Sequence, residues 1–467
     1  MEQSIQFIGA TGSVTGSMSL LRSGNRNYLV DCGMYQERHL RKRNWAPFPL
    51  DPESIDGLFL THAHLDHCGL IPKLVREGFR GPIFCTPPTA DIAKIILYDA
   101  AHIQEEDAAF KRKRHEREGR RGPFPEAALY THQDVERAIP LFHPVKYGEP
   151  IGEDESVQAI FYEAGHILGS GMIEFTLSSE GQSKIVVFSG DVGHWDKPIM
   201  RNPTLLERGD CIVVESTYGD RLHEEVSSVK ETLADVINGT VTGGGNVIIP
   251  SFAVERTQEL LYYLSELLRE GTIPHLMTFV DSPMAVRVTE VFDQYPEYFD
   301  QETLKRIHSG DLPFYFETLR LTKTTAESKA INHIRASCII IAGSGMCTGG
   351  RIKHHLVNNI SRSQNVVLFV GYQAHGTLGR QIVDGAKRVR IHGHNHPVNA
   401  RIEQIHGFSA HADQAELVKW LSAFREGSRH IYVIHGESKV QKKFAHVVHS
   451  RIGHDVVIPE YLDKVAL

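Results

Sequence analysis

Short runs of apolar residues recur along the chain, and polar or glycine-rich segments separate them. Bounded runs of this kind predict buried β-strands. Four of the predicted strands lie at residues 58–60, 161–165, 184–188 and 430–434. A histidine or an aspartate follows each of them within a few positions. Because open α/β sheets carry their functional loops at strand C-termini, these four strand ends predict a functional site.

The pattern changes from about residue 208 onward, where strands and helices alternate regularly. Strands are predicted near residues 211–214, 246–249, 275–280, 338–342 and 365–370. Helices are predicted near 226–238, near 255–269, from about 284 and after 351. This alternation is typical of a second α/β unit of Rossmann-like rhythm. At 467 residues the chain is also too long for one ordinary core and predicts two domains.

The most informative segment is Thr-His-Ala-His-Leu-Asp-His at residues 61–67. His62 and His64 are two positions apart, so in extended backbone their side chains project to the same side. Asp66 and His67 lie where the chain turns into a predicted helix and can point elsewhere. Nitrogen and oxygen ligands arranged two and two suit a pair of metal ions better than one ion.

Further candidate ligands follow other predicted strands. His166 and Asp191 each leave an apolar strand and enter a glycine-rich loop, and His435 repeats this pattern. A lone histidine is more often a structural residue, but several at equivalent strand ends predict a shared site. Asp31 also follows a predicted strand. From local sequence it could be a turn residue or a residue that orders a neighbouring loop.

Three segments have a less specific signal. The glycine-rich loop 343–351 could cradle a phosphate with backbone N–H groups, although it is not a Walker motif, or it could be a tight structural turn. Residues 111–121, which follow a helix predicted over 89–110, hold seven basic and two acidic residues. They could form a solvated face, a flexible loop or a mobile arm that contacts phosphates. Alternating histidines within 389–406 lack an accompanying carboxylate and are interpreted as the return from the second unit.

The composition excludes several classes of protein. A hydrophobic content of 41% and a charged content of 23% are typical of a globular protein. No run of apolar residues is long enough to span a membrane, and the N-terminus lacks a signal-peptide pattern. Six scattered cysteines without a CxxC pair predict reduced thiols in a cytoplasmic protein. The net charge of −7 gives no general attraction for nucleic acid, so a polyanion must be bound by local patches or by metal.

The His-x-His-x-Asp-His motif, with distant single histidine and aspartate residues, resembles the metallo-β-lactamase superfamily. Glu215 after an apolar strand, Gly-Phe-Ser-Ala-His-Ala-Asp at 407–413, and His435 in Val-Ile-His-Gly-Glu are similar to the β-CASP nuclease branch. The likeness is strongest to the RNA-cleaving endonucleases of mRNA 3′-end processing and their stand-alone prokaryotic relatives. It covers essentially the whole chain.

This resemblance implies an α/β fold, namely an αββα sandwich interrupted by an inserted Rossmann-like cap, with the active site in the cleft between them. The expected boundaries are 1–208 and 396–467 for the metallo-β-lactamase domain and 209–395 for the inserted β-CASP domain. The resemblance also implies two zinc ions per chain. One would be bound by His62, His64 and His166, the other by Asp66, His67 and His435, with Asp191 as the bridging carboxylate.

The resemblance implies roles for the remaining residues as well. Asp31 would order the site from behind the ligands, and the catalytic residues would be His411, Glu215, Asp191 and Asp66. His435 favours RNA over DNA, because DNA-acting members tend to have an apolar residue at that position. The candidate RNA contacts are Ser344, Gly345, Arg351, Arg256 and Arg380.

The expected activity is hydrolysis of phosphodiester bonds in single-stranded RNA by a hydroxide that the two zinc ions activate. The expected cleavage is endonucleolytic, with exonuclease activity left open. The alternatives are a DNA nuclease, a small-molecule (thio)ester hydrolase on the same metal core, and a non-catalytic RNA-binding subunit. The small-molecule hydrolase would need neither Glu215 nor His411. A homodimer is compatible with the sequence, which does not fix the oligomeric state.

Overall fold

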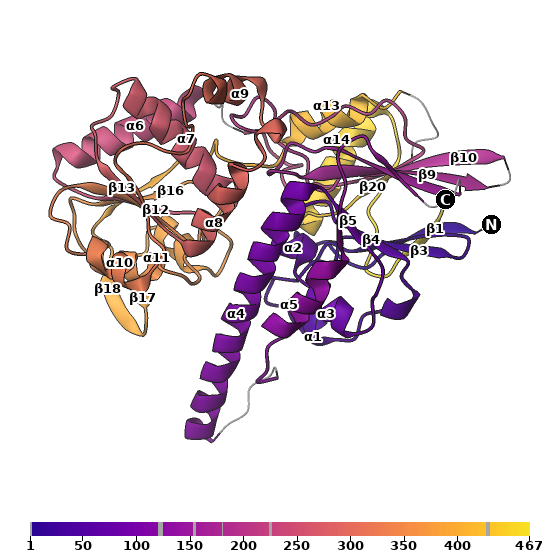
Figure 1. The fold of residues 1–467 in the computed structure, drawn as a ribbon, viewed down its shortest axis with the longest axis horizontal. Coiled ribbons are helices and arrows are strands. Elements are labelled where there is room, and N and C mark those ends of the chain that lie inside the picture. The colour runs from indigo at the N-terminus through magenta and orange to yellow at the C-terminus, as the bar shows by residue number, and fades with distance from the viewer. Residues whose placement is uncertain (1, 120–124, 153–155, 180, 224–226, 426–429) are drawn as a thin grey trace. The chain divides into compact units, whose positions relative to one another are not determined.

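The computed structural model describes residues 2–119, 125–152, 156–179, 181–223, 227–425 and 430–467. The chain divides into two compact units (Figure 1). The first consists of Met1–Trp195, Asn202–Leu222 and His411–Leu467, and the second of Asp196–Arg201 and His223–Ala410.

Two seven-stranded sheets form the first unit. The first sheet has the order β22-β1-β2-β3-β4-β5-β6, with β1 (Gln3–Phe7), β2 (Ser19–Ser23), β3 (Arg26–Val30), β4 (Gly57–Phe59), β5 (Ile83–Cys85), β6 (Phe142–Pro144) and β22 (Lys464–Ala466). The second has the order β21-β20-β11-β10-β9-β8-β7, with β7 (Pro150–Ile151), β8 (Val157–Glu163), β9 (Gly171–Ser179), β10 (Gln182–Phe188), β11 (Cys211–Val214), β20 (His430–Val433) and β21 (Val456–Val457).

Helices cover both outer faces of this pair of sheets (Figure 1). Those beside the first sheet are α1 (Lys42–Trp45), α2 (Leu65–Cys68), α3 (Ile71–Arg76), α4 (Pro87–Glu118) and α5 (His132–Ala138), with the short 3-10 turns Pro52–Ser54 and Ile139–Leu141. Those beside the second sheet are α13 (Gln414–Ser422) and α14 (Ser438–Ile452). The order helix, sheet, sheet, helix is the expected αββα sandwich.

The alternation of side chains along β10 explains why its sequence is almost continuously apolar. Val186 and Phe188 face the core between the two sheets. Ile185 and Val187 face the opposite way and pack in the core that contains Trp420 of α13. A strand that is buried on both faces needs apolar residues at every position.

The second unit contains a six-stranded parallel sheet of order β14-β13-β15-β12-β16-β19 and a separate hairpin. Its strands are β12 (Val247–Pro250), β13 (Met277–Asp281), β14 (Leu319–Leu321), β15 (Cys338–Ala342), β16 (Val366–Phe369) and β19 (Arg401–Gln404), and the hairpin is β17 (Arg388–Ile391) with β18 (His394–Pro397). Its helices are α6 (Ser227–Thr242), α7 (Arg256–Arg269), α8 (Pro283–Phe292), α9 (Gln301–His308), α10 (Thr325–Ile331), α11 (Ile352–Asn359) and α12 (Leu378–Val383), with a 3-10 turn at Pro296–Tyr298. The predicted inserted α/β unit has this architecture.

The second unit consists of His223–Ala410 with the short segment Asp196–Arg201, compared with the expected range of 209–395. β11 pairs in parallel with β10 and β20, so it belongs to the second sheet of the first unit. The histidine-rich hairpin and β19 still belong to the second unit, which continues to Ala410. An apolar run predicts a strand but does not show which sheet the strand joins.

Of the three alternatives for the basic segment, its described part matches the solvated face, because it is helical and mostly exposed. Helix α4 continues through residues 111–118 and ends at Gly119, whose φ of 64° lies in the left-handed region. Residues 120 and 121 of that segment lie outside the described residues. No helix in the described part of the chain has the combined length and apolarity of a membrane span.

Candidate metal centre

Most of the predicted site residues lie at the C-terminal ends of neighbouring parallel strands in the first unit. Asp191, Glu215 and His435 follow β10, β11 and β20, which are adjacent in the second sheet. Asp31 and His62 follow β3 and β4, which are adjacent in the first sheet. The two sheets therefore bring together residues that are far apart in the sequence.

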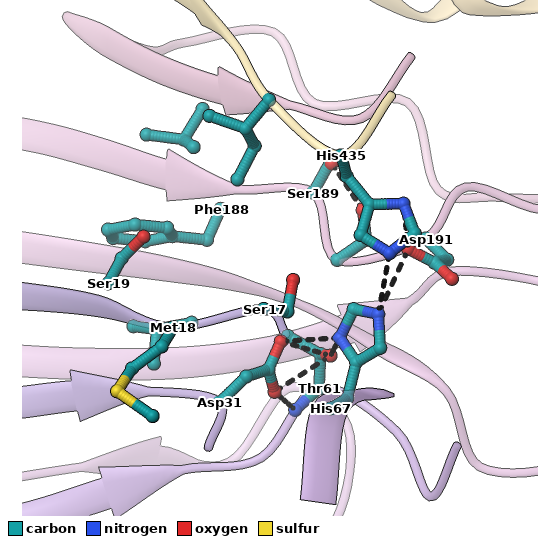
Figure 2. A pocket seen from close by; sticks show the side chains of 14 residues that line it. Ser17, Met18, Ser19, Asp31, Thr61, His67, Phe188, Ser189, Asp191 and His435 are labelled. Carbon is teal, nitrogen blue, oxygen red and sulfur yellow. Dashed lines mark hydrogen bonds and ion pairs between the residues drawn. The ribbon is translucent and has the colours of Figure 1, made fainter. Parts of the chain in front are cut away.

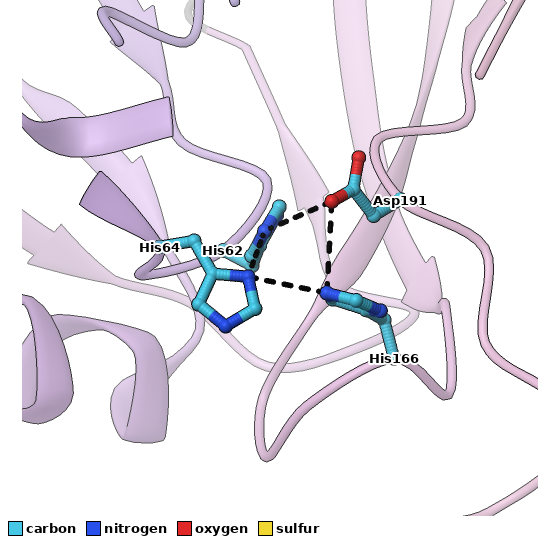
Figure 3. Close-up of side chains that lie close together, drawn as sticks. All are labelled: His62, His64, His166 and Asp191. Atoms are coloured by element: carbon cyan, nitrogen blue, oxygen red, sulfur yellow. Dashed lines mark hydrogen bonds and ion pairs between the residues drawn. The ribbon is translucent and has the colours of Figure 1, made fainter. Parts of the chain in front are cut away.

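The first group of candidate ligands is His62, His64, His166 and Asp191 (Figure 3). His64 Nδ1 lies 3.1 Å from His62 Nε2 and 3.2 Å from His166 Nε2. Asp191 Oδ2 lies 3.4 Å from His62 Nε2 and 3.6 Å from His166 Nε2. Ligand atoms on a tetrahedral ion with bonds of roughly 2.0–2.1 Å are about 3.3 Å apart, so this spacing fits four ligands of one metal ion.

The second group is Asp66, His67 and His435. His67 Nε2 lies 3.1 Å from His435 Nε2, which lies 3.6 Å from Asp66 Oδ2. Asp191 Oδ1 lies 3.4 Å from His67 Nε2 and 3.5 Å from His435 Nδ1. His435 therefore faces Asp66 and His67 with Nε2 but Asp191 with Nδ1, and Asp191, Glu215 and His435 form a further possible metal-binding group.

The side chain of Asp191 faces both groups, because one carboxylate oxygen points to each. The residue is almost completely buried, and its Oδ1 atom accepts no hydrogen bond from the described residues. A buried carboxylate oxygen without a hydrogen bond is costly unless a cation satisfies it. The donor set therefore fits a divalent metal ion.

Burial and neighbouring charges divide the histidines into two kinds. Burial, with the charge of His67, lowers the pKa of His62 well below its usual value, and burial lowers the pKa of His64 to about 4. Burial would also lower the pKa of His67, but the carboxylates of Asp191 and Asp31 outweigh it and raise the pKa well above the usual range. His62 and His64 are thus neutral and ready to bind metal, whereas His67 must release a proton first.

Asp31 and Thr61 support the histidines from behind (Figure 2). Asp31 Oδ2 lies 2.7 Å from His67 Nδ1, and Asp31 Oδ1 accepts hydrogen bonds from the N–H and the hydroxyl of Thr61 at 2.8 and 3.0 Å. Both residues border a small cavity between the two sheets, next to Asp191 and His435. Of the two roles open for Asp31, this position matches the ordering role.

Glu215 and His411 form a pair beside the ligands. His411 Nδ1 lies 3.1 Å from Glu215 Oε1 and 3.8 Å from Asp191 Oδ2. Glu215 is buried and also accepts the N–H groups of Val192 at 2.7 Å and Thr217 at 3.2 Å. Burial alone would lower the pKa of His411, but Glu215 and Asp191 outweigh it and raise the pKa to about 9. These two carboxylates therefore favour the protonated form of the His411 ring at neutral pH.

The predicted RNA contacts all lie in the second unit. Two of the three arginines make contacts with buried residues of that unit. Arg351 Nη1 donates to Asp281 Oδ1 at 2.6 Å, and the buried Arg256 lies over the ring of Phe408 at 5.5 Å. The guanidinium of Arg380 is more exposed and pairs with Asp384 at 2.8 Å.

Ser344 and Gly345 also have structural contacts within the glycine-rich loop. The Ser344 hydroxyl accepts the N–H of Thr348 at 3.0 Å. A side chain at Gly345 would meet the ring of Phe252 at 2.7 Å, so only glycine allows this close approach. The tight-turn interpretation of the loop therefore has direct structural support.

Three supporting contacts have no signal in the amino-acid sequence. Thr61 and Thr217 place hydroxyls 3.1 Å from Nδ1 of His62 and of His435, respectively. The backbone N–H of His435 donates to the carbonyl of Ala10 at 2.7 Å, in the N-terminal glycine-rich turn. Threonine and alanine are too common for sequence to reveal such contacts.

Comparison with protein families gives three matches along the chain. The metallo-beta-lactamase superfamily matches residues 11–82, the Beta-Casp domain residues 257–382, and the Zn-dependent metallo-hydrolase RNA specificity domain residues 395–459. They occur in the order that an interrupted metallo-β-lactamase domain requires. The first covers His62, His64, Asp66 and His67, and the last covers His411 and His435.

Similar proteins include a ribonuclease of Thermus thermophilus, TTHA0252, which is 37% identical over 92% of each chain. The transcription termination factor FttA of Methanocaldococcus jannaschii is 30% identical over 99% of this chain and 71% of its own. A protein of unknown function from Enterococcus faecalis has a similar fold, with a TM-score of 0.58 over both full lengths and 10% identity. These matches show that the chain belongs to the β-CASP family of the metallo-β-lactamase superfamily.

Proposed function

We propose that this protein is a ribonuclease that uses two zinc ions to hydrolyse phosphodiester bonds of single-stranded RNA, with internal cleavage during RNA processing or decay. The observation that carries the proposal is the position of Asp191, whose two oxygens each face a separate group of histidines beside the His411–Glu215 pair. The names of the two relatives, a ribonuclease and a transcription termination factor, support RNA as the substrate.

Imidazole and carboxylate ligands at tetrahedral spacing favour zinc over the oxygen-only coordination that magnesium prefers. His62, His64 and His166 would hold one ion, Asp66, His67 and His435 the other, and Asp191 would contact both. When bound, two such ions supply a nucleophilic hydroxide at neutral pH and a positive charge for a phosphate oxygen.

The chain itself supplies the proton that the leaving oxygen needs. Glu215 accepts at His411 Nδ1, which leaves Nε2 as the donating nitrogen of the protonated ring. The backbone N–H groups of Val192 and Thr217 hold Glu215 in place. His411 would donate from Nε2 to the departing RNA oxygen, and Glu215 would keep the ring oriented and charged.

The substrate contacts and the location belong to the same proposal. Arg380 and the loop that contains Ser344 and Gly345 would contact phosphates, whereas Arg351 and Arg256 would act by supporting the second unit from inside. A cytoplasmic location is supported by the six cysteines, all of which are free and buried. Disulfide-forming compartments rarely leave every cysteine of a chain unpaired.

The decisive experiment compares substrates on the zinc-loaded protein. Single-stranded RNA, DNA of the same sequence and a small thioester are incubated with it, and the nucleic acids are labelled at either end in separate reactions. We expect internal RNA fragments, with DNA and thioester left intact. An Asp191→Asn variant, purified in parallel, controls for contaminating nuclease. Thioester hydrolysis without RNA cleavage would contradict the proposal, and so would cleavage that the variant retains.

A further inference from the structure

Two of the histidines whose Nε2 atoms face the candidate metal centre have a polar partner at Nδ1. Asp31 Oδ2 lies 2.7 Å from His67 Nδ1, and the Thr61 hydroxyl lies 3.1 Å from His62 Nδ1. Metal-binding histidines usually have such a partner, which fixes the tautomer and the direction of the ring. The partner therefore decides whether Nε2 carries a lone pair for the metal.

His435 has a partner of the same kind in Thr217. The Thr217 hydroxyl lies 3.1 Å from His435 Nδ1, while His435 Nε2 faces His67 Nε2 at 3.1 Å. Thr217 thus occupies, relative to His435, the place that Thr61 occupies relative to His62. Strands β11 and β20 are neighbours, and Thr217 and His435 follow their ends, so the sheet brings the two residues together.

The position of His435 makes this contact necessary. Its backbone has a φ of 50°, in the left-handed region, so the regular geometry of a strand does not direct its side chain. Asp191 Oδ1 lies 3.5 Å from His435 Nδ1 and competes with Thr217 for that nitrogen. Without the hydroxyl, the ring would be free to turn toward Asp191 and present the wrong nitrogen to the second group.

We propose that Thr217 is a positioning residue for His435, and that its hydroxyl sets the affinity of the metal ion shared with Asp66 and His67. The inference rests on the proposed two-metal site. The backbone N–H of Thr217 also donates to Glu215 Oε2 at 3.2 Å. Side-chain substitution leaves this second contact in place, so it isolates the effect of the hydroxyl on His435.

The test compares Thr217→Val, which keeps the shape of the side chain but removes the hydroxyl, with Thr217→Ser, which keeps the hydroxyl. Zinc content is measured by elemental analysis after dialysis against a graded competing chelator, so the readout does not depend on RNA cleavage. We expect Thr217→Val to keep the first ion and to bind the second about 10–100-fold more weakly. Thr217→Ser should bind both ions as the unmodified protein does.

Ser216→Ala is the matched control, because the neighbouring Ser216 hydroxyl donates to the carbonyl of Ile434 at 2.9 Å and not to the His435 ring. It should leave both affinities unchanged. Thermal melting of each zinc-loaded variant establishes that it is folded. If Thr217→Val does not fold, Thr217→Ala replaces it under the same expectation.

Three results would overturn the inference: two ions bound by Thr217→Val with unchanged affinity, equal weakening of both ions, or a single ion in the unmodified protein. If the unmodified protein binds two ions and fails to cleave RNA, the proposed function is wrong. Selective weakening of the second ion by Thr217→Val would still support the role of Thr217 in that case. The two proposals therefore fail in distinguishable ways.

Discussion

The imidazole of His411 is paired with the carboxylate of Glu215, and neither residue is among the proposed zinc ligands. Its Nδ1 lies 3.1 Å from Glu215 Oε1, whereas His67 Nε2 and His62 Nε2 face Asp191. Its chemistry should therefore be separable from metal binding.

Replacing His411 with alanine should leave both ions bound and slow RNA cleavage by about 10²–10⁴-fold, the usual contribution of a general acid. Zinc analysis and single-turnover cleavage measure the two effects. A variant that loses zinc would show that His411 is a ligand. Glu215→Gln, which removes the charge but keeps the shape, should slow cleavage in the same direction.

The same residue predicts how cleavage depends on pH. Glu215 and Asp191 outweigh burial and raise the pKa of His411 to about 9, so the acid form is present below that pH and is lost as the pH rises through it. Zinc ions beside the ring would lower this value by repulsion. We therefore expect the cleavage rate to fall on an alkaline limb at or below about pH 9. The limb should be absent in His411→Ala, and its persistence there would assign it to another group.

At the scale of elements, the loops after β8 and β10 approach each other so closely that only glycine fits between them. A Cβ atom at Gly193 would lie 1.9 Å from the carbonyl oxygen of Gly165 and 2.7 Å from the N–H nitrogen of His166. Gly193 also donates its N–H to the carbonyl of Ala164 at 2.7 Å. The two loops hold His166 and Asp191 in register through this contact.

Gly193→Ala should force the loops apart, displace His166, and reduce both zinc affinity and the melting temperature. Gly239→Ala is a suitable control, because Gly239 lies inside α6 and a Cβ atom there would meet only the Arg401 guanidinium at 3.9 Å. That control should be neutral or stabilising by up to about 1 kcal/mol. Equal zinc binding by both variants would argue against the proposed role of the loop contact.

A buried ion pair joins three segments of the second unit. Lys197 Nζ lies 2.9 Å from Glu259 of α7 and donates to the carbonyls of Phe408 and Ser409 at 3.4 and 3.0 Å. Both charged side chains are almost fully buried. Removing one partner would leave the other charge buried and unpaired, which is usually more costly than losing the attraction itself.

Lys197→Met should therefore lower the free energy of unfolding by about 3–5 kcal/mol, measured by urea titration of the zinc-loaded protein. Lys230→Met is the matched control, since Lys230 pairs with Glu266 and Glu270 at a more exposed position. It should cost at most about 1 kcal/mol. Similar values for the two variants would mean that burial does not strengthen the Lys197 contact.

Some secondary-structure elements could be predicted from sequence patterns and others could not. The strand at 338–342 was predicted from its apolar run and is β15. For residues 111–121 the charge left a solvated face, a loop and an arm open, and the helix through residue 118 was missed although lysine, arginine and glutamate are good helix formers. A run of charged side chains indicates that a segment is exposed to solvent. It does not exclude a helical backbone.

At the scale of the whole molecule, the family resemblance implied the interrupted architecture, and the three family matches occur along the chain in the corresponding order. The position of β11 was less predictable, because an apolar strand can join either sheet until tertiary pairing decides. The threonines that orient His62 and His435 were unpredictable for a related reason. A hydroxyl acquires its role only when the fold places it beside a ring nitrogen.

Metal removal should destabilise the first unit, because its ligands come from both sheets. A ligand at about 1,000 times its dissociation constant adds about 4 kcal/mol of stability. Chelation with EDTA should therefore lower the melting temperature by about 8 °C or more and abolish RNA cleavage. Zinc should restore both. An unchanged melting temperature in metal-free protein would show that the cluster folds without an ion.

The chain order of the ligands has a consequence for synthesis on the ribosome. His67 and His435 face each other although 368 positions separate them. Domains fold as they emerge from the N-terminal side, so the early ligands are exposed long before β20 exists. Until the inserted unit has been translated, the second group lacks its last histidine. A chain that is still being synthesised therefore cannot bind the second ion as the finished protein would.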